Sequence, residues 1–134
     1  MATTGRRMRW GGVLALAMVL AAPAGAQGPA QLAAVPPRVR ADVQTQFLAE
    51  RLHLSDAQRA QVDAINLKYA EQMQPLLLGS TWTLMSEGKK VDAAKDGDLR
   101  GVLSPQQFET YLGLKDALRE RLKQKAAESA GATP

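Results

Sequence analysis

The chain is short, with 134 residues of which 46% are hydrophobic, and it carries 17 basic and 13 acidic side chains. This length allows one domain at most. The absence of cysteine excludes disulfides, thiol nucleophiles and cysteine-based zinc sites. The single histidine, His53, leaves no imidazole pair for catalysis or metal binding. Composition therefore argues against most classes of enzyme.

Residues 1–26 have the order of features of a secretory signal peptide. Three arginines and no acid occupy the first ten positions, an apolar stretch follows, and Ala24-Gly25-Ala26 gives the small-residue pattern of a cleavage site. The apolar stretch is short for a membrane span, which needs ~20 residues, so cleavage is favoured over an uncleaved anchor. We expect a periplasmic chain that starts near Gln27 and has no stable membrane insertion.

Removal of this segment changes the charge balance. It takes away three arginines, so 14 of the 17 basic residues remain against 13 acidic ones. A nearly neutral chain has no general electrostatic footprint for nucleic acid, and we expect no such partner. Because the expected compartment holds no ATP, any mechanism must work without nucleotide hydrolysis.

The remaining chain divides by composition. Residues 27–37 are rich in Ala, Pro and Gly without charge and predict a flexible leader. Residues 38–128 show helical hydrophobic spacing without the alternation of strands, and residues 129–134 predict a disordered tail after a frayed end. The first helix is expected from about Arg38 to Leu52, with Val39, Val43 and Phe47 on one row and Leu48 and Leu52 on its neighbour.

Two further helices are expected to begin at the same five-residue pattern. In each, a serine at the N-cap can accept a hydrogen bond from the third helical amide, while a glutamine at that third position reaches back to the N-cap amide, which makes a capping box. Pro105 occupies the first helical position of the second copy, where proline is favoured. The helix-capping residues are Leu54, Ser55 and Gln58, and Leu103, Ser104 and Gln107.

The apolar stripes that follow the two motifs agree in register. A shift of 49 residues pairs the motifs, and it also pairs Val62 with Tyr111, Ile65 with Leu114, Tyr69 with Leu118, and Met73 with Leu122. The same shift aligns both the capping residues and the apolar stripes, which favours an internal repeat. We infer two related units of helix, capped turn and helix, the first over 38–78 and the second over roughly 80–128.

The join between the two units is the weakest part of the pattern. Pro75 is expected to kink or end the helix before it. Apolar residues within 81–102 suggest a third helix, but three glycines each oppose it by about 1 kcal/mol relative to alanine. These are Gly88, Gly97 and Gly101. We expect one frayed or broken helix, or two short pieces.

No catalytic residue, metal ligand or cofactor is expected. His53 has only Asp56 and Glu50 nearby in the sequence, and with no second histidine this is a poor metal site. We interpret it as an exposed histidine in a loop or at a helix end. Ser55 and Ser104 have no general base at a recognisable spacing, and capping explains both.

Acidic residues around Gly97 resemble part of a calcium loop. Asp92 and Asp96 fit the first and fifth positions when Gly97 is the sixth, but Ala94 and Leu103 stand where two further ligands, including the bidentate acid, are required. We interpret the segment as a polar turn broken by glycine.

The densest apolar cluster straddles Pro75 and Gly79, at the tip of the proposed hairpin. One interpretation is that the cluster forms intramolecular core or a dimer seam. The other is that it forms an exposed, adaptable surface, since Met and Trp make tolerant contacts with varied partners. The residues that we select as client or dimer contacts are Met73, Leu77, Trp82 and Met85.

Two leucine–serine–x–x–glutamine segments in a small secreted helical protein resemble the LTXXQ-motif periplasmic family, which includes the Spy and CpxP proteins. The resemblance covers about residues 50–128. It implies an all-α fold of antiparallel helical hairpins, about four helices in all, assembled as a thin, bent homodimer with a concave face. Spy-type members shield unfolded envelope proteins without ATP, and CpxP-type members restrain a sensor kinase.

A homodimer is also expected from burial. A thin helical fold of this length buries about two-thirds of its unfolded surface, and flanking residues such as Leu48, Leu67 and Leu112 would stay partly exposed. We therefore expect a non-enzymatic, periplasmic homodimer that binds exposed apolar segments of envelope proteins as an ATP-independent chaperone or stress protein. The alternatives are an accessory regulator that docks on an envelope sensor kinase, and a structural stress protein without a general client.

Overall fold

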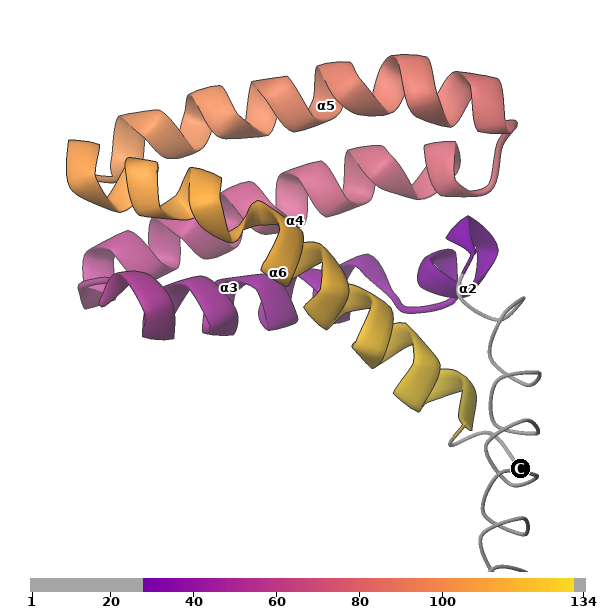
Figure 1. Ribbon diagram of the computed structural model, residues 1–134, viewed down its shortest axis with the longest axis horizontal. Helices are drawn as coiled ribbons and strands as arrows, with labels where there is room; N and C mark the ends of the chain where they lie inside the picture. Colours follow the sequence, from indigo (N-terminus) through magenta and orange to yellow (C-terminus); the bar gives the residue numbers. More distant parts are fainter. Residues whose placement is uncertain (1–27, 132–134) are drawn as a thin grey trace, which may run out of the picture.

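The computed structural model describes residues 28–131, which form five helices and no strand (Figure 1). A short helix, α2 (Pro29–Ala33), precedes four long ones: α3 (Pro37–Leu52), α4 (Asp56–Leu77), α5 (Thr81–Val102) and α6 (Pro105–Gly131). The expected all-α fold with about four helices is therefore confirmed. The predicted signal peptide lies outside the described residues.

The long helices form antiparallel hairpins whose turns meet at one end of the molecule. α3 and α4 run side by side, and α5 returns along α4 (Figure 1). α6 starts beside the end of α5, then diverges from it and crosses α3 to reach α2 (Figure 1). The α3–α4 turn and the α5–α6 turn consequently lie together at one end, whereas α5 and α6 are splayed at the other.

The hydrophobic core lies toward the end where these two turns meet. Val62 and Tyr111, which the 49-residue shift pairs, are both at most 1% exposed within it. The core residues are Leu48, Leu52, Val62, Leu99, Leu103, Phe108, Tyr111 and Leu118. The prediction that Leu48 stays partly exposed is wrong, because residues of α4, α5 and α6 join it in this cluster and it is fully buried.

Both predicted capping boxes are present. The Ser55 hydroxyl accepts a hydrogen bond from the Gln58 amide at 3.1 Å, and the Gln58 side-chain oxygen accepts one from the Ser55 amide at 3.1 Å. Ser104 and Gln107 repeat this arrangement at 3.1 and 2.9 Å. Each box satisfies two of the amides that a helix start leaves without partners. Helices α4 and α6 therefore begin where the sequence predicts.

The two glutamines also bind each other, and we call this pair, Gln58 and Gln107, the glutamine clasp. Nε2 of Gln58 donates to Oε1 of Gln107 at 2.8 Å, and Nε2 of Gln107 donates to Oε1 of Gln58 at 3.2 Å. Each Nε2 also donates to the end of a helix, Gln58 to the Val102 carbonyl at 3.2 Å and Gln107 to the Leu52 carbonyl at 3.1 Å. The clasp thereby joins the two turns to each other.

Helix α5 is continuous, so the prediction of a frayed or broken segment over 81–102 is wrong. Ser80 caps its start by accepting a hydrogen bond from the Thr83 amide at 3.1 Å. Gly88 is buried, and a Cβ there would lie 3.7 Å from Leu84 and 3.9 Å from Met73. Packing against α4 and polar contacts with both neighbouring helices outweigh the low helix propensity of glycine.

Helix α4 runs two residues past Pro75 and ends at Leu77, so Pro75 does not end it. Two boundaries at the ends of the described residues differ from expectation. The described part of the predicted flexible leader, from Gly28, is folded: it contains α2, and Val35 is 2% exposed. Helix α6 extends to Gly131, with Ala126 buried, so residues 129–131 are helical rather than part of a disordered tail. Contact between α2 and α6 explains the last two differences, because each covers the other.

The glutamine clasp should couple the two turns energetically. We expect Gln58→Ala and Gln107→Ala each to lower the free energy of unfolding by about 2 kcal/mol, since each removes a helix cap and leaves partly buried polar groups unpaired. The double variant should lose less than the sum of the two, by about 1 kcal/mol. Urea unfolding of the four chains measures this coupling.

Gln106→Ala is the matched control, because Gln106 is exposed beside Gln107. It should change the free energy of unfolding by less than about 0.5 kcal/mol. Strictly additive losses in the Gln58 and Gln107 variants would contradict a clasp that acts as one unit.

Candidate ligand cleft

The sequence-predicted capping residues have structural roles. Their side chains cap the starts of α4 and α6, and the two glutamines also bind each other. The four residues are Ser55, Gln58, Ser104 and Gln107. His53 is exposed at the end of α3, with φ 53° and ψ 53°, and its amide donates to the Ala49 carbonyl. That left-handed conformation closes the helix. These residues therefore position the turns and offer no reactive group.

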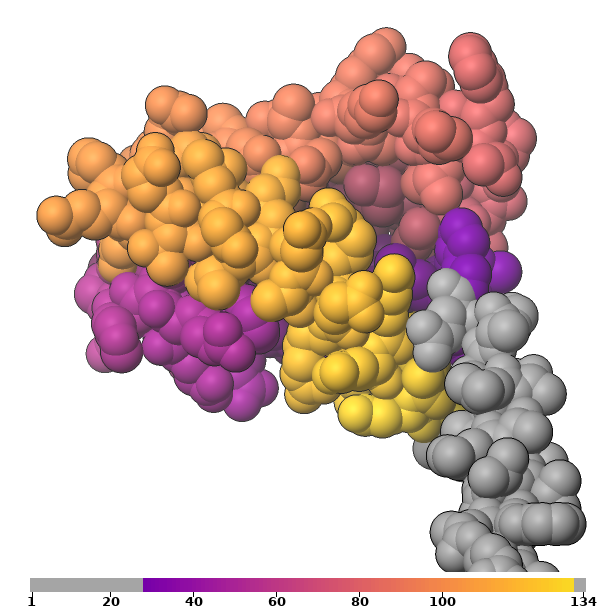
Figure 2. Space-filling model, in the orientation of Figure 1, coloured from indigo at the N-terminus to yellow at the C-terminus, as the bar shows by residue number. Residues whose placement is uncertain are grey.

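A cavity of about 460 Å³ lies where α5 and α6 diverge. Figure 2 shows this hollow between α5 and the second half of α6, with parts of α4 and α2 visible inside it. Its walls are mainly apolar and come from α2, α4, α5 and α6; the larger members are Leu32, Met73, Leu77, Leu84, Val91, Leu118 and Leu122. We call this cavity the cleft. Its size is in the range of about 300–1,000 Å³ found for small-molecule sites.

Lys95 lies at the polar, inner part of the cleft. Its Nζ donates to Oε1 of Gln44 at 2.7 Å, a contact with an uncharged group. Desolvation lowers the pKa of Lys95 to about 8, with nearby Lys115 acting in the same direction and Asp92 and Asp96 opposing it. A lysine whose charge is destabilised by burial is a frequent mark of a binding or reactive site.

Lys115 forms ion pairs with Asp92 and Asp96, the two carboxylates near Lys95. Its Nζ lies 2.6 Å from Asp92 and 2.8 Å from Asp96, and Asp96 also accepts a hydrogen bond from the Tyr111 hydroxyl at 2.6 Å. Burial raises the pKa of Tyr111, and that hydrogen bond acts in the same direction. The prediction of a glycine-broken turn around these acids is wrong, since Asp92 and Asp96 lie on continuous α5 and bind α6.

Arg40 fixes one side of the cleft. It is 3% exposed, and its guanidinium donates to the Ala70 carbonyl at 2.9 Å, to Oε1 of Gln74 at 2.8 Å and to the Leu32 and Val35 carbonyls. Gln74 in turn donates to the Ala33 carbonyl at 3.0 Å. Desolvation lowers the pKa of Arg40. These bonds cap the end of α2 and hold it against α3 and α4.

The charges around the cleft are unequal. Five basic residues and one acidic residue, Asp92, line it. The basic residues are Arg40, Lys95, Lys115, Arg119 and Lys123. Arg119 and Lys123 also pair with acids on the outer face of α6, at 2.7 and 3.2 Å. Three of the five lining cations therefore have carboxylate partners, whereas Arg40 and Lys95 bind only uncharged oxygen atoms.

The predicted contact residues divide between the cleft and the surface. Met73 and Leu77 line the cleft, and Leu77 is buried. Trp82 and Met85 are 80% and 61% exposed, next to Leu78 at 67%. We call Leu78, Trp82 and Met85 the tip patch, since they lie at the α4–α5 turn. Leu77 is thus buried and Trp82 and Met85 are exposed, while their role as client or dimer contacts stays a prediction.

Sequence reasoning missed the cleft, the buried Arg40 and the partly buried Lys95, although the sequence holds a signal for both cations. Lys95 interrupts the row Val91, Lys95, Leu99 on one face of α5. Arg40 and Gln44 continue the row of Leu48 and Leu52 at four-residue spacing toward the start of α3. A cation within an apolar row is costly unless it has partners. Among residues 28–131, no group of three or more His, Asp or Glu side chains is placed to hold a metal ion.

Lys95 should make stability increase with pH above neutrality. Its pKa is about 8 in the folded chain against an ordinary 10.5, so between these values only the unfolded chain keeps the proton and the free energy of unfolding rises with pH. The rise is at most about 3 kcal/mol. Urea unfolding between about pH 8 and 10 measures it. Lys95→Met should abolish the slope, and Lys89→Met, on the exposed face of α5, should keep it.

Arg40 should be essential for the folded position of α2. Arg40→Met removes the donors of several carbonyls and is expected to lower the free energy of unfolding by about 3 kcal/mol, with faster amide exchange over residues 29–35. Arg38→Met is the control on the same helix. Arg38 binds Asp42 and Asp63 at the surface, where water screens ion pairs, so its loss should be much smaller. Equal effects of the two variants would contradict this role.

None of the helices in the described part of the chain is long and apolar enough to cross a membrane. No curated protein and no solved structure was found to match the chain. A family model described as "Domain of unknown function (DUF4890)" matches residues 26–111, more than half of the chain. The match includes α2 to α5, both capping boxes and Tyr111. The chain therefore belongs to the DUF4890 family.

Proposed function

We propose that this protein is a non-enzymatic, periplasmic binding protein that holds exposed apolar segments of other envelope proteins without ATP. The observation that carries the proposal is the tip patch, in which Leu78, Trp82 and Met85 are each more than half exposed. Large apolar side chains that stay exposed favour a contact surface. Leu77 and Leu84, which adjoin Leu78 and Met85 in the sequence, line the cleft instead.

The chemistry of the patch suits varied clients. Methionine is flexible and polarizable, and tryptophan offers a large contact area. Affinity comes from removing apolar surface from water, which is reversible and needs no nucleotide. Release then follows when a client folds and buries its own apolar segment.

The two capping motifs support a relationship with the LTXXQ-motif family, which we also propose. Each motif opens a long helix, and the two stand in one register along the chain. The signal-peptide pattern of residues 1–26 supports a periplasmic location after cleavage. We further propose a homodimer, in which exposed apolar residues such as Leu112, 40% exposed, lie at the seam.

The proposal is tested by aggregation of several unrelated denatured proteins at near-equimolar ratio. The chain should slow the aggregation of each, and the triple variant Leu78→Ser, Trp82→Ser, Met85→Ser should lose most of this effect. Gln106→Ser is the control, because Gln106 is exposed at the start of α6, away from the tip patch and from the α4–α5 turn. Light scattering on the same samples gives the mass and shows whether each variant keeps it.

Two outcomes would overturn the chaperone role. In the first, aggregation is unaffected and one envelope sensor kinase is captured instead, which makes the protein an accessory regulator. In the second, the triple variant protects as well as the unchanged chain, which removes the tip patch from the mechanism.

A further inference from the structure

Two cations line the cleft without a charged partner: Arg40, which is buried, and Lys95, which is partly buried. Among the described residues, neither has a carboxylate within ion-pair distance. The hydrogen bond of Lys95 goes to the Gln44 amide, and those of Arg40 go to carbonyls and the Gln74 amide. Asp92 and Asp96, the nearest acids to Lys95, are bound by Lys115. The tip patch of the proposed function does not account for this arrangement.

We propose that the cleft binds a single-chain anionic amphiphile, a long-chain carboxylate, with its head group at Lys95 and its alkyl chain along the apolar walls toward the α4–α5 turn. This inference goes beyond the proposed function and does not depend on it, because it concerns the inside of the cleft.

The positions of the lining residues fit an elongated ligand with one charged end. Along α5, Leu84 lies eleven residues before Lys95, which corresponds to about 16 Å at 1.5 Å per residue. The Leu84 end is walled by Leu77 and Met73, whereas the Lys95 end holds Gln44 and the Tyr111–Asp96–Lys115 network. The polarity of the cleft therefore changes along its length.

The charge of the cleft selects an anion. Of the five basic residues that line it, Lys115, Arg119 and Lys123 already pair with carboxylates, and Asp92, the one acid in the lining, is bound by Lys115. Lys95 binds only the uncharged Gln44 side chain. A carboxylate beside Lys95 would supply the opposite charge that the Gln44 amide lacks, in a shielded setting where such attraction is stronger than in water. Arg40 is less available, because it already donates to four oxygen atoms; it acts by holding α2 as a wall.

The same walls disfavour a polypeptide as the occupant. Each residue of a peptide carries an amide and a carbonyl that must find partners when buried. Leu32, Met73, Leu77, Leu84 and Leu122 offer none to such a chain. An alkyl chain needs only apolar contact and matches these walls.

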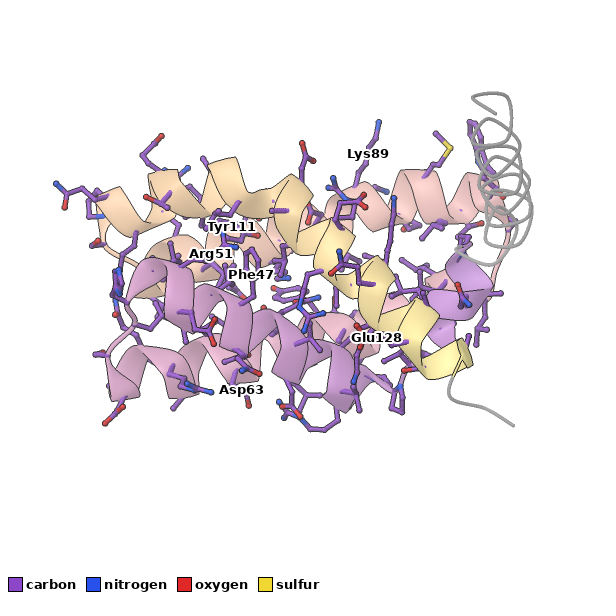
Figure 3. All side chains as sticks on the ribbon, turned by 60° about the horizontal axis from the view of Figure 1, so that its bottom comes forward. Phe47, Arg51, Asp63, Lys89, Tyr111 and Glu128 are labelled. Carbon is purple, nitrogen blue, oxygen red and sulfur yellow. The ribbon has the colours of Figure 1, made fainter. Side chains whose placement is uncertain are left out.

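The test is calorimetric titration of the chain with dodecanoate, below its micelle concentration, compared with neutral dodecanol and cationic dodecyltrimethylammonium. Dodecanoate should bind at least tenfold more tightly than either. Lys95→Met should lose at least tenfold in dodecanoate affinity while binding dodecanol as before, and Lys95→Arg should keep most of the affinity. Lys89→Met is the matched control: Lys89 points away from the bundle, whereas Tyr111 points into it (Figure 3).

Circular dichroism of each variant shows that it is folded before titration. No binding of dodecanoate, equal binding of dodecanol, or tighter binding of the cation would overturn the proposal. So would a Lys95→Met variant that is folded and binds dodecanoate normally. The triple tip-patch variant should bind dodecanoate unchanged, so this proposal and the proposed chaperone function can fail separately.

Discussion

The structure depends on one reciprocal amide contact, the glutamine clasp. Gln58 and Gln107 each complete a capping box at the start of their own helix and bind each other and the end of a helix from the opposite turn. One side chain therefore stabilises a helix start, a helix end and a tertiary contact. This arrangement sets α4 and α6 in the same register, which brings Val62 and Tyr111 into one core.

Fixing the two turns at one end leaves the other end free to differ. α6 crosses α3 instead of following α5, and the separation of α5 and α6 creates the cleft. Beyond the hydrophobic core, polar contacts hold the helices together. Arg40 holds α2, and Lys115 joins α5 to α6 through Asp92 and Asp96. The molecule thus has a closely packed half that provides stability and an open half with room for a ligand.

The helix starts could be predicted from the sequence because capping is local: Ser55, Gln58, Ser104 and Gln107 lie within three residues of what they bind. The contact between the two glutamines joins residues far apart in the sequence. The sequence indicated it only through the 49-residue repeat, which pairs the two positions. Helix propensity misled at Gly88, which is buried in α5, because the packing of α5 against α4 outweighs the low propensity of glycine. In α3, the half-buried Val39 row predicted a helix, but the buried row contains Arg40 and Gln44, whose partners come from distant helices.

The contact between α2 and α6 has a consequence for the order of folding. It joins the first and last described helices, so it has nearly the greatest sequence separation possible within residues 28–131. Local hairpins form faster than contacts between distant parts of a chain. The α3–α4 hairpin can therefore form early, while α2 stays uncovered until α6 has folded beside it. We therefore expect a chain shortened before α6 to lack a complete cleft even where its first hairpin is native.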